Sequence, residues 1–309
     1  MIISNMKLSI AVITYNQKDT ISTTLDSILS QEHDYTYEVV VGDDCSSDGT
    51  RDVLLNYQTR YPNIIKLLLN EQNLGVVGNY FNVIKHCSGE YIMQCAGDDW
   101  WLPNKVTPQI QYMDTHSECG MCYTKAANYV QERECQIGSW GGPYTKFCDL
   151  IKANTIPALT IIARTDLFLR YIDEINPMSH DWKMEDYPMW LWFAHNSQIK
   201  FIDEITAVYR VLQNSASHSQ DISLKIAFVQ ACIDIQSYFI ERYGFKGVDV
   251  EYIRLKSLLH IHALYGSISS YVDIWLKCIV KHPKYLLRHK PYAYLLFFIV
   301  PFLRERYIH

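Results

Sequence analysis

Long apolar runs are missing from this chain of 309 residues. No segment reaches the roughly 18 consecutive apolar residues of a membrane-spanning helix, and the amino terminus lacks the basic region and apolar core of a secretion signal. The formal net charge of −5 is small, so no strong positive field favours binding to nucleic acid. We therefore expect a cytoplasmic protein that does not bind nucleic acid.

A disulfide framework is also missing. The nine cysteines are odd in number and irregularly spaced, in a chain long enough to bury a core without cross-links, which predicts free thiols in a reducing compartment. Cys119 and Cys122 have the spacing of a metal or redox pair, but no second pair accompanies them. We expect both to pack in the core as small apolar side chains.

Strands and helices alternate through the first hundred residues. Continuous apolar runs predict strands at 8–13, 37–41, 64–69 and 91–95. Apolar residues at helical spacing predict helices over 21–28, 52–61 and 76–87. In the last of these, the residues expected to face inward are Val76, Tyr80, Val83, Ile84 and Cys87. This alternation predicts an α/β fold, a mostly parallel, doubly wound sheet with helices on both faces.

After residue 100 the pattern is less regular. Pro103 is expected to open a helix, because a first-turn position needs no backbone N–H, and residues 131–153 are expected to form a mobile aromatic loop. Further strands are expected at 119–123, 159–163, 199–202 and 206–209. From Ile222 onward, apolar residues at helical spacing predict helices. The chain is therefore expected to divide near Gln220 into an α/β domain (1–220) and a C-terminal helical region (221–309).

Two pairs of adjacent carboxylates follow predicted strands. Asp43 and Asp44 follow the strand at 37–41, and Asp98 and Asp99 follow the strand at 91–95. Carboxyl ends of parallel strands share one edge of the sheet, where ligands bind, and carboxylates there suit a hard divalent cation completed by water and substrate phosphates. Either pair alone could be an exposed acidic turn. Two such pairs predict a site.

Four motifs stand in an order typical of a known family. They are Ile13-Thr14-Tyr15-Asn16, Gly42-Asp43-Asp44-Cys45-Ser46, Ala96-Gly97-Asp98-Asp99 and Glu185-Asp186. In this order they resemble the motifs of the inverting glycosyltransferases of family 2, and the likeness covers roughly Lys7 to Ser219. It implies a GT-A (Rossmann-like) fold, a nucleotide-sugar donor and Mg²⁺ or Mn²⁺ as cofactor. The helices that follow resemble the variable tails of bacterial members that build surface polysaccharides.

The resemblance implies a role for the first two motifs in donor binding. The residues concerned are Thr14, Tyr15, Asn16, Asp43 and Asp44. Tyr15 offers a face on which the base can stack, and Asp44 would accept a hydrogen bond from a base N–H, which suits uracil and hence a UDP-sugar. Because Cys45 replaces the family's glycine, this turn is not expected to need positive φ.

The resemblance assigns the metal to the third motif. Asp98 and Asp99 would hold the cation, with Asp98 also able to reach the donor's ribose, while Ala96 replaces the family's leading acid. Late in the likeness, Arg210 would support the diphosphate and His218 would be an extra metal ligand. The alternative for His218 is an ordinary surface histidine.

The resemblance identifies Asp186 as the general base, with Glu185 beside it in the substrate site. Inversion requires one carboxylate near the acceptor hydroxyl, on the face opposite the departing phosphate. The alternative is that the two acids only stabilise the N-terminus of the helix they begin, through its dipole.

The predicted function is transfer of a sugar to a hydroxyl of a glycan or lipid-linked acceptor in cell-surface polysaccharide synthesis. Two alternatives remain: a sugar-phosphate nucleotidyltransferase, and a non-catalytic relative that binds nucleotide sugar within an assembly complex. The aromatic segment 292–303 lies between basic clusters, so the tail 277–309 is expected either to contact the inner face of the cell membrane peripherally or to pack as a last core helix.

Overall fold

The computed structural model describes residues 6–212, 221–284 and 289–299. Contacts between residues divide the chain into unit 1, Met1–Val211, and unit 2, Leu212–His309. The expected boundary near Gln220 falls outside the described residues.

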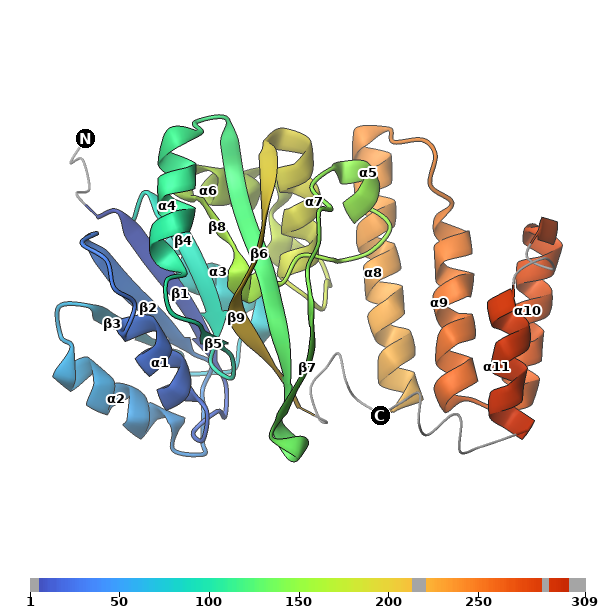
Figure 1. Cartoon of the computed structure of the whole chain (residues 1–309), viewed down its shortest axis with the longest axis horizontal. Coiled ribbons are helices and arrows are strands. Elements are labelled where there is room, and N and C mark those ends of the chain that lie inside the picture. The colour runs from blue at the N-terminus through green and yellow to red at the C-terminus, as the bar shows by residue number, and fades with distance from the viewer. Residues whose placement is uncertain (1–5, 213–220, 285–288, 300–309) are drawn as a thin grey trace. The chain divides into compact units, whose positions relative to one another are not determined.

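Unit 1 is built around a nine-stranded sheet (Figure 1). Its strands are β1 (Leu8–Thr14), β2 (Tyr37–Asp43), β3 (Ile65–Leu69), β4 (Tyr91–Ala96), β5 (Trp100–Trp101), β6 (Cys119–Val130), β7 (Cys135–Trp140), β8 (Ile162–Arg164) and β9 (Gln198–Val211). Their order is β3-β2-β1-β4-β8-β6-β9-β5, with β7 paired to β6. The first four strands are parallel, as predicted. The sheet is mixed beyond them, because β8 runs antiparallel to both β4 and β6.

Helices cover both faces of this sheet, which confirms the predicted fold class. They are α1 (Ile21–Leu29), α2 (Thr50–Arg60), α3 (Gly75–Lys85), α4 (Val106–Thr115), α5 (Phe147–Leu150), α6 (Thr165–Ile175) and α7 (Asp186–Asn196). Apolar side chains of α1, α2 and α4 share one core cluster with alternate residues of β1, β2 and β4. On the other face α3 packs against β1 and β2 and contacts α6, which in turn contacts α7. Both faces of β1, β2 and β4 are therefore buried, as their continuous apolar runs require, whereas the edge strand β3 is only partly buried.

The second half of unit 1 differs from the predicted pattern. Residues expected to form a loop contain β7, which pairs antiparallel with β6 after a short 3₁₀ turn, η1 (Gln131–Arg133), and also contain α5. The two short strands expected near residues 199–209 are one strand, β9, paired in parallel with β6. The strand expected at 159–163 is a 3₁₀ turn, η2 (Ala158–Thr160), followed by β8. Helix α6 was not predicted.

Two local predictions in the first half were wrong. Pro103 does not open a helix, because Asn104 follows it with φ of +63°, a conformation that a helix cannot contain, and α4 begins at Val106. Val76 is exposed rather than inward, whereas Tyr80, Val83 and Ile84 are buried as expected. Cys119 and Cys122 are buried free thiols in β6, as predicted.

Unit 2 is helical, as predicted. Its helices are α8 (Ile222–Tyr243), α9 (Val250–Tyr265), α10 (Ile268–Lys281) and α11 (His289–Ile299). Side chains of Asp221, Asp249 and Ser267 accept backbone hydrogen bonds at the starts of α8, α9 and α10, the usual role of these residue types. Apolar residues of α9, α10 and α11 form its core. None of the helices that the structure describes is long and apolar enough to span a membrane.

Candidate active site

The carboxyl ends of β1, β2 and β4 lie side by side. The strand register pairs Thr14 with Asp43 and Ile13 with Ala96. The polar turns that follow the three strands therefore meet at one edge of the sheet, and both acidic pairs lie there, as predicted. In an open α/β sheet this edge is where ligands bind.

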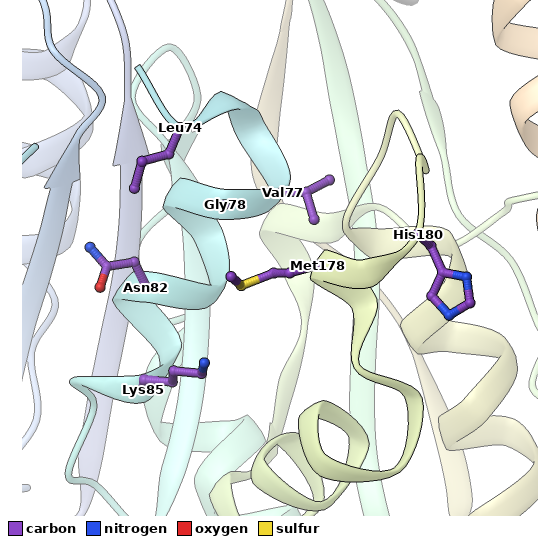
Figure 2. Close-up of a pocket in the computed structure, with 7 residues that line it drawn as sticks. All are labelled: Leu74, Val77, Gly78, Asn82, Lys85, Met178 and His180. Carbon is purple, nitrogen blue, oxygen red and sulfur yellow. The ribbon is translucent and has the colours of Figure 1, made fainter. Parts of the chain in front are cut away.

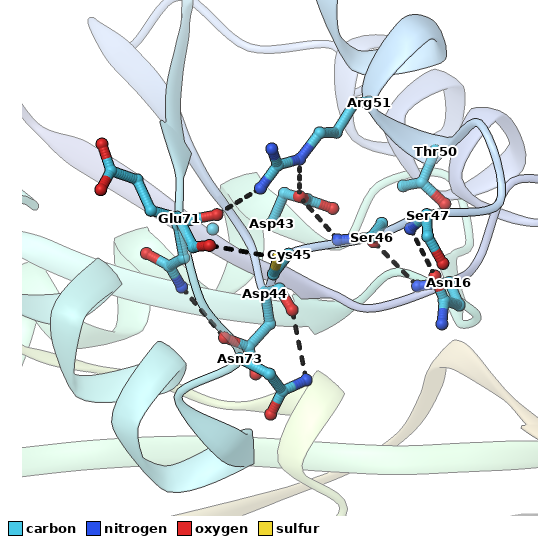
Figure 3. Close-up of polar contacts among 12 residues, drawn as sticks. Asn16, Asp43, Asp44, Cys45, Ser46, Ser47, Thr50, Arg51, Glu71 and Asn73 are labelled. Carbon is cyan, nitrogen blue, oxygen red and sulfur yellow. Dashed lines mark hydrogen bonds and ion pairs between the residues drawn. The ribbon is translucent and has the colours of Figure 1, made fainter.

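Asp43 shapes the turn after β2. Its Oδ2 accepts hydrogen bonds from the backbone N–H of Ser46 (3.1 Å) and from Arg51 Nε (2.6 Å), as Figure 3 shows. Because the carboxylate is buried, the arginine counterion is what makes its charge tolerable. The other oxygen, Oδ1, is buried and accepts no hydrogen bond. One acceptor at this position is therefore available to a ligand.

Asp44 anchors the loop before α3. Its Oδ1 accepts hydrogen bonds from the backbone N–H of Leu74 (2.7 Å) and from Asn70 Nδ2 (3.1 Å), and its backbone carbonyl accepts one from Asn73 Nδ2 (3.2 Å). Oδ2 receives no hydrogen bond from the described residues. One oxygen is thus fixed by the protein, and the second is left for a donor group on a ligand.

Two residues in these turns have left-handed backbone conformations. Cys45 has φ of +66° and Asn16 has φ of +51°. The expectation that the turn at Cys45 needs no positive φ was therefore wrong, and the family's glycine is the residue that suits this conformation best. Asn16 holds the two turns together, since its backbone N–H donates to Ser46 Oγ (2.9 Å) and its Oδ1 accepts from the Ser47 N–H (2.9 Å).

The turn after β1 lies close to the acidic loop, which is the segment Ala96-Gly97-Asp98-Asp99 at the end of β4. A Cβ atom at Gly97 would lie 2.5 Å from Gln17 Oε1 and 2.8 Å from Thr14 Oγ1, so only glycine fits there. Both of these oxygens are buried and make no hydrogen bond. Tyr15, in contrast, is 50% exposed, so its ring is accessible for stacking. Orphaned polar atoms beside an accessible aromatic ring are typical of a ligand site.

The acidic loop is fixed from two directions. Thr20, just before α1, donates through Oγ1 to the backbone carbonyl of Gly97 (2.9 Å), and Thr24, on α1, donates through Oγ1 to that of Asp99 (2.6 Å). From the end of β9, the backbone N–H of Arg210 donates to Asp99 Oδ1 (2.8 Å), and Arg210 Nε donates to the carbonyl of Asp98 (2.6 Å). The position of the Asp98–Asp99 pair is therefore set by groups far apart in the sequence.

The electrostatics of Asp98 and Asp99 fit a cation. Burial raises the pKa of Asp98 and raises the pKa of Asp99 well above its usual range; the Asp98 carboxylate adds to the second shift, and Arg210 opposes both. Two crowded, desolvated carboxylates would be stabilised by a divalent ion. Among the described residues, no group of three or more His, Cys, Asp or Glu side chains could hold a metal. A hard cation that also binds substrate phosphates needs only one or two carboxylates, so the pair fits such an ion.

The side chain of Arg210 supports the acidic loop from beside a cluster of aromatic rings and does not extend freely into the site. Its guanidinium lies over the ring of Trp100 (4.7 Å to the centroid) and near Tyr129 (5.8 Å) and contacts Gln131. The side chain predicted to support a diphosphate is thus mostly buried and engaged with β5 and the β6–β7 turn. His218, the predicted extra metal ligand, lies outside the described residues.

The Glu185–Asp186 pair stands at the start of α7, as predicted. Asp186 accepts hydrogen bonds from Asn154 Nδ2 (2.9 Å) and from the backbone N–H of Tyr187 (2.6 Å). Burial raises the pKa of Asp186, against these hydrogen bonds. Burial also raises the pKa of Glu185 to about 8, with a further contribution from the Asp186 charge. At neutral pH one of the two acids therefore holds a proton readily, which suits a proton-transfer site.

A small cavity lies between Glu185 of this pair and Asp99 of the acidic loop. It has a volume of about 40 Å³, and the polar residues that line it are Tyr80, Gln94, Asp99 and Glu185. Tyr80 Oη donates to Gln94 Oε1. Neither Tyr80 nor Gln94 was predicted as a site residue, although a glutamine inside the apolar run of β4 was a visible signal. The cavity brings together motifs separated by almost ninety residues.

A larger cavity of about 450 Å³ lies along α3 and the 3₁₀ turn η3 (Pro177–Ser179) (Figure 2). Its lining residues are Leu74, Val77, Gly78, Asn82, Lys85, Met178 and His180. None of the sequence-predicted site residues is among them. It is linked to the acidic edge through Leu74, whose N–H donates to Asp44, and through Asn82, which donates to Asn70, a second donor to Asp44.

The fold and this site define an α/β protein with a polar, acidic ligand site at the carboxyl edge of its parallel strands. The sequence model described as glycosyl transferase family 2 matches residues 9–164, and the chain belongs to this family. It is 31% identical over 223 residues to the Escherichia coli UDP-Glc:alpha-D-GlcNAc-diphosphoundecaprenol beta-1,3-glucosyltransferase WfgD, covering 71% of this chain and 82% of that protein. It is 30% identical over 219 residues to an uncharacterised protein of Mycobacterium tuberculosis, covering 69% of this chain but only 61% of the relative's length.

Solved structures share the fold. S. aureus TarS 1–349 in complex with UDP-GlcNAc aligns with a TM-score of 0.57 at 18% identity, covering 94% of this chain and 88% of that one. The mannosyltransferase PcManGT of Pyrobaculum calidifontis, in complex with GDP-Man and Mn²⁺, aligns with a TM-score of 0.58 at 16% identity, covering 94% and 85%. These likenesses confirm the predicted GT-A type of architecture.

Proposed function

We propose that this protein is an inverting glycosyltransferase that moves a sugar from a UDP-sugar to a hydroxyl of a glycan or lipid-linked acceptor in cell-surface polysaccharide synthesis. Family membership supports sugar transfer. The names of the relatives support the substrate classes: WfgD is named for a UDP-glucose donor and a diphosphoundecaprenol-linked acceptor, and TarS was solved with UDP-GlcNAc.

The donor's nucleoside would bind at the turns after β1 and β2. The exposed ring of Tyr15 offers a stacking face for the base. Asp44 Oδ2 has no donor within the described protein and would accept the imide N–H of uracil. Thr14 Oγ1 and Asp43 Oδ1 are buried acceptors without partners, and Asn16 keeps both turns in register.

Asp98 and Asp99 would hold Mg²⁺ or Mn²⁺ beside the donor's diphosphate. When bound, such a cation supplies Lewis-acid stabilisation of the charge that develops on the departing nucleoside diphosphate. Arg210 would act through the loop it supports, by holding Asp98 and Asp99 at the sheet edge. The presence of Mn²⁺ in the complex of PcManGT supports a divalent ion.

Asp186 would be the general base. Its carboxylate takes the proton of the acceptor hydroxyl as that oxygen attacks the anomeric carbon from the face opposite the phosphate, and the bond to the phosphate oxygen breaks. Asn154 and the Tyr187 N–H orient the carboxylate. Glu185, with a pKa of about 8, would be largely protonated at neutral pH and would leave the negative charge on Asp186.

The observation that carries the proposal is the cavity that Asp99 and Glu185 both line, which supports a single centre for the proposed metal ion and the proposed base. The test is a panel of nucleotide sugars incubated with Mn²⁺ or Mg²⁺, with and without sugar acceptors. Release of nucleoside diphosphate with formation of a glycoside supports the proposal. Binding of donors without turnover would favour the non-catalytic relative, and release of pyrophosphate from UTP and a sugar phosphate would favour the nucleotidyltransferase.

A lipid-linked acceptor would be met at a bilayer. We therefore place the protein in the cytoplasm at the inner face of the cell membrane, with the tail 277–309 in peripheral contact with lipid.

A further inference from the structure

Part of the predicted lipid-binding segment, residues 292–303, packs in the core of unit 2. On α11, Tyr294, Leu295, Phe297 and Phe298 pack against the buried cluster of α9 and α10. Only one side of this helix remains outward, where Tyr292 and Leu296, four residues apart, are exposed. An interface with lipid therefore needs apolar surface from elsewhere in unit 2.

Helix α10 supplies that surface. Its inner face buries Tyr271, Ile274 and Cys278. On the opposite side Leu276 and Val280 are 54% and 79% exposed, and their separation of four residues keeps them on one side of the helix. A soluble helix normally presents polar residues there.

The exposed rows of α10 and α11 adjoin each other. Trp275 and Tyr292 meet edge to face with ring centroids 5.0 Å apart, which joins the two helices at the level of Leu276. The α10–α11 patch is therefore defined as Leu276, Val280, Tyr292 and Leu296. Aromatic residues with polar atoms beside aliphatic ones are typical of an interface between water and lipid.

The segment of the chain that contains this patch is basic. Residues 274–303 contain five Lys or Arg and no Asp or Glu, so the rest of the chain has a formal net charge of −10. Lys277 and Lys281 lie beside the patch on α10, and their ion pairs with Asp273 (2.7 Å) and Glu251 (3.4 Å) are exposed. Exposed ion pairs are weak, so these lysines can exchange their partners for anionic headgroups.

We propose that the α10–α11 patch is a docking surface for an anionic lipid bilayer, with its apolar side chains in the interface and the surrounding lysines against headgroup phosphates. Peripheral helices of this composition bind through apolar burial together with attraction to anionic lipid. A two-fold contact with a second copy would set the lysine-rich surfaces of the two copies against each other, which disfavours self-association. Binding at this patch would bring the protein to the bilayer that holds the proposed lipid-linked acceptor, and in this respect it rests on the proposed function. The test of lipid binding involves no sugar transfer.

The test is flotation of the full-length protein with phosphatidylcholine vesicles, with and without phosphatidylglycerol. The protein should float with anionic vesicles, less at high salt, and little with neutral ones. The double variant Leu276→Glu with Val280→Glu should lose about tenfold or more of this binding, because it replaces two apolar side chains of the patch with carboxylates that anionic lipid repels. Leu224→Glu is the matched control, since Leu224 on α8 is also 54% exposed but lies outside the patch.

Circular dichroism and the thermal shift produced by UDP should be unchanged in both variants, which separates this test from that of the proposed function. Failure of the native protein to float with anionic vesicles would overturn the inference, and so would equal flotation of the double variant. A native dimer by light scattering that the double variant dissociates would instead make the patch an interface between copies of this chain.

Discussion

Asp99 Oδ1 accepts a hydrogen bond of 2.8 Å from the backbone N–H of Arg210, a residue 111 positions further along the chain. This contact joins the acidic loop after β4 to the end of β9. It also gives Asp99 two separate roles, because the same carboxylate fixes the loop and supplies charge to the proposed cation site.

Substitutions of Asp99 separate these roles. Asp99→Asn keeps an oxygen that can accept from Arg210 but removes the charge, so it should retain the native melting temperature and lose the Mn²⁺-dependent stabilisation by UDP. Asp99→Ala should lower the melting temperature and also lose the Mn²⁺-dependent stabilisation by UDP. Its free energy of unfolding should fall by about 1–3 kcal/mol, because the buried N–H of Arg210 is left unpaired. Thermal shift with UDP, with and without Mn²⁺, measures these effects. Normal Mn²⁺-dependent stabilisation of Asp99→Asn would refute the metal assignment.

The side chain of Arg210 should matter for donor binding without touching the donor. Arg210→Lys keeps the charge but loses the Nε hydrogen bond to the Asp98 carbonyl, which should weaken UDP binding in the presence of Mn²⁺ by about tenfold, the equivalent of one such bond. Calorimetric titration gives the affinity. Arg170→Lys, an exposed change on α6, is the control, and equal affinities in the two variants would argue against the supporting role.

Lys105 should make the stability of unit 1 depend on pH. It is fully buried, with Nζ donating to Gln109 Oε1 (2.7 Å) and to the Thr160 carbonyl (2.9 Å), and burial lowers its pKa to about 7. Between about pH 7 and the ordinary lysine value, the unfolded chain holds more protons than the folded one, so stability rises with pH by at most about 1.4 kcal/mol per unit.

Urea unfolding at several pH values should show this rise, and Lys105→Met should reduce it. Lys66→Met, at an exposed position on β3, should leave the pH dependence unchanged. If the free energy of unfolding changed with pH equally in all three proteins, Lys105 would not be the group responsible.

The left-handed turn at Cys45 leads to a prediction about stability. Cys45→Gly should be at least as stable as the native protein, because glycine adopts positive φ without steric cost. Cys45→Val should lose about 1 kcal/mol or more, since a β-branched residue is strongly disfavoured there. Thermal unfolding of the two variants measures the difference, and a valine variant as stable as the glycine variant would contradict the observed backbone.

The first four strands and their helices were predictable because their signals are local. The apolar runs of β1, β2 and β4 are buried on both faces and end in polar turns, and the parallel connections then place Asp43 and Asp98 at one edge. The second half was not predictable in the same way. Strand β7 is mostly exposed, so its sequence has no apolar signature, and it is a strand only because it pairs with β6.

The detailed site depended on contacts between distant segments. No spacing in the sequence indicates that the backbone of Arg210 holds Asp99, or that Asn154 orients Asp186. Tyr80 was correctly expected to face inward, but its place beside Glu185 depends on how α3 and α7 pack on the same side of the sheet. The motifs identified the chemistry, and the topology determined which of their atoms meet.

The most direct test of the central claim compares Asp186→Asn with Glu185→Gln in release of UDP from an accepted donor, with an acceptor and the divalent cation present. Asp186→Asn should bind UDP normally and react at least about a hundredfold more slowly, because it removes the base. Glu185→Gln should stay close to the native rate, because glutamine replaces an acid that is largely protonated at neutral pH. Near-native turnover by Asp186→Asn, with donor binding intact, would contradict the account and leave the pair as the N-terminal acids of α7.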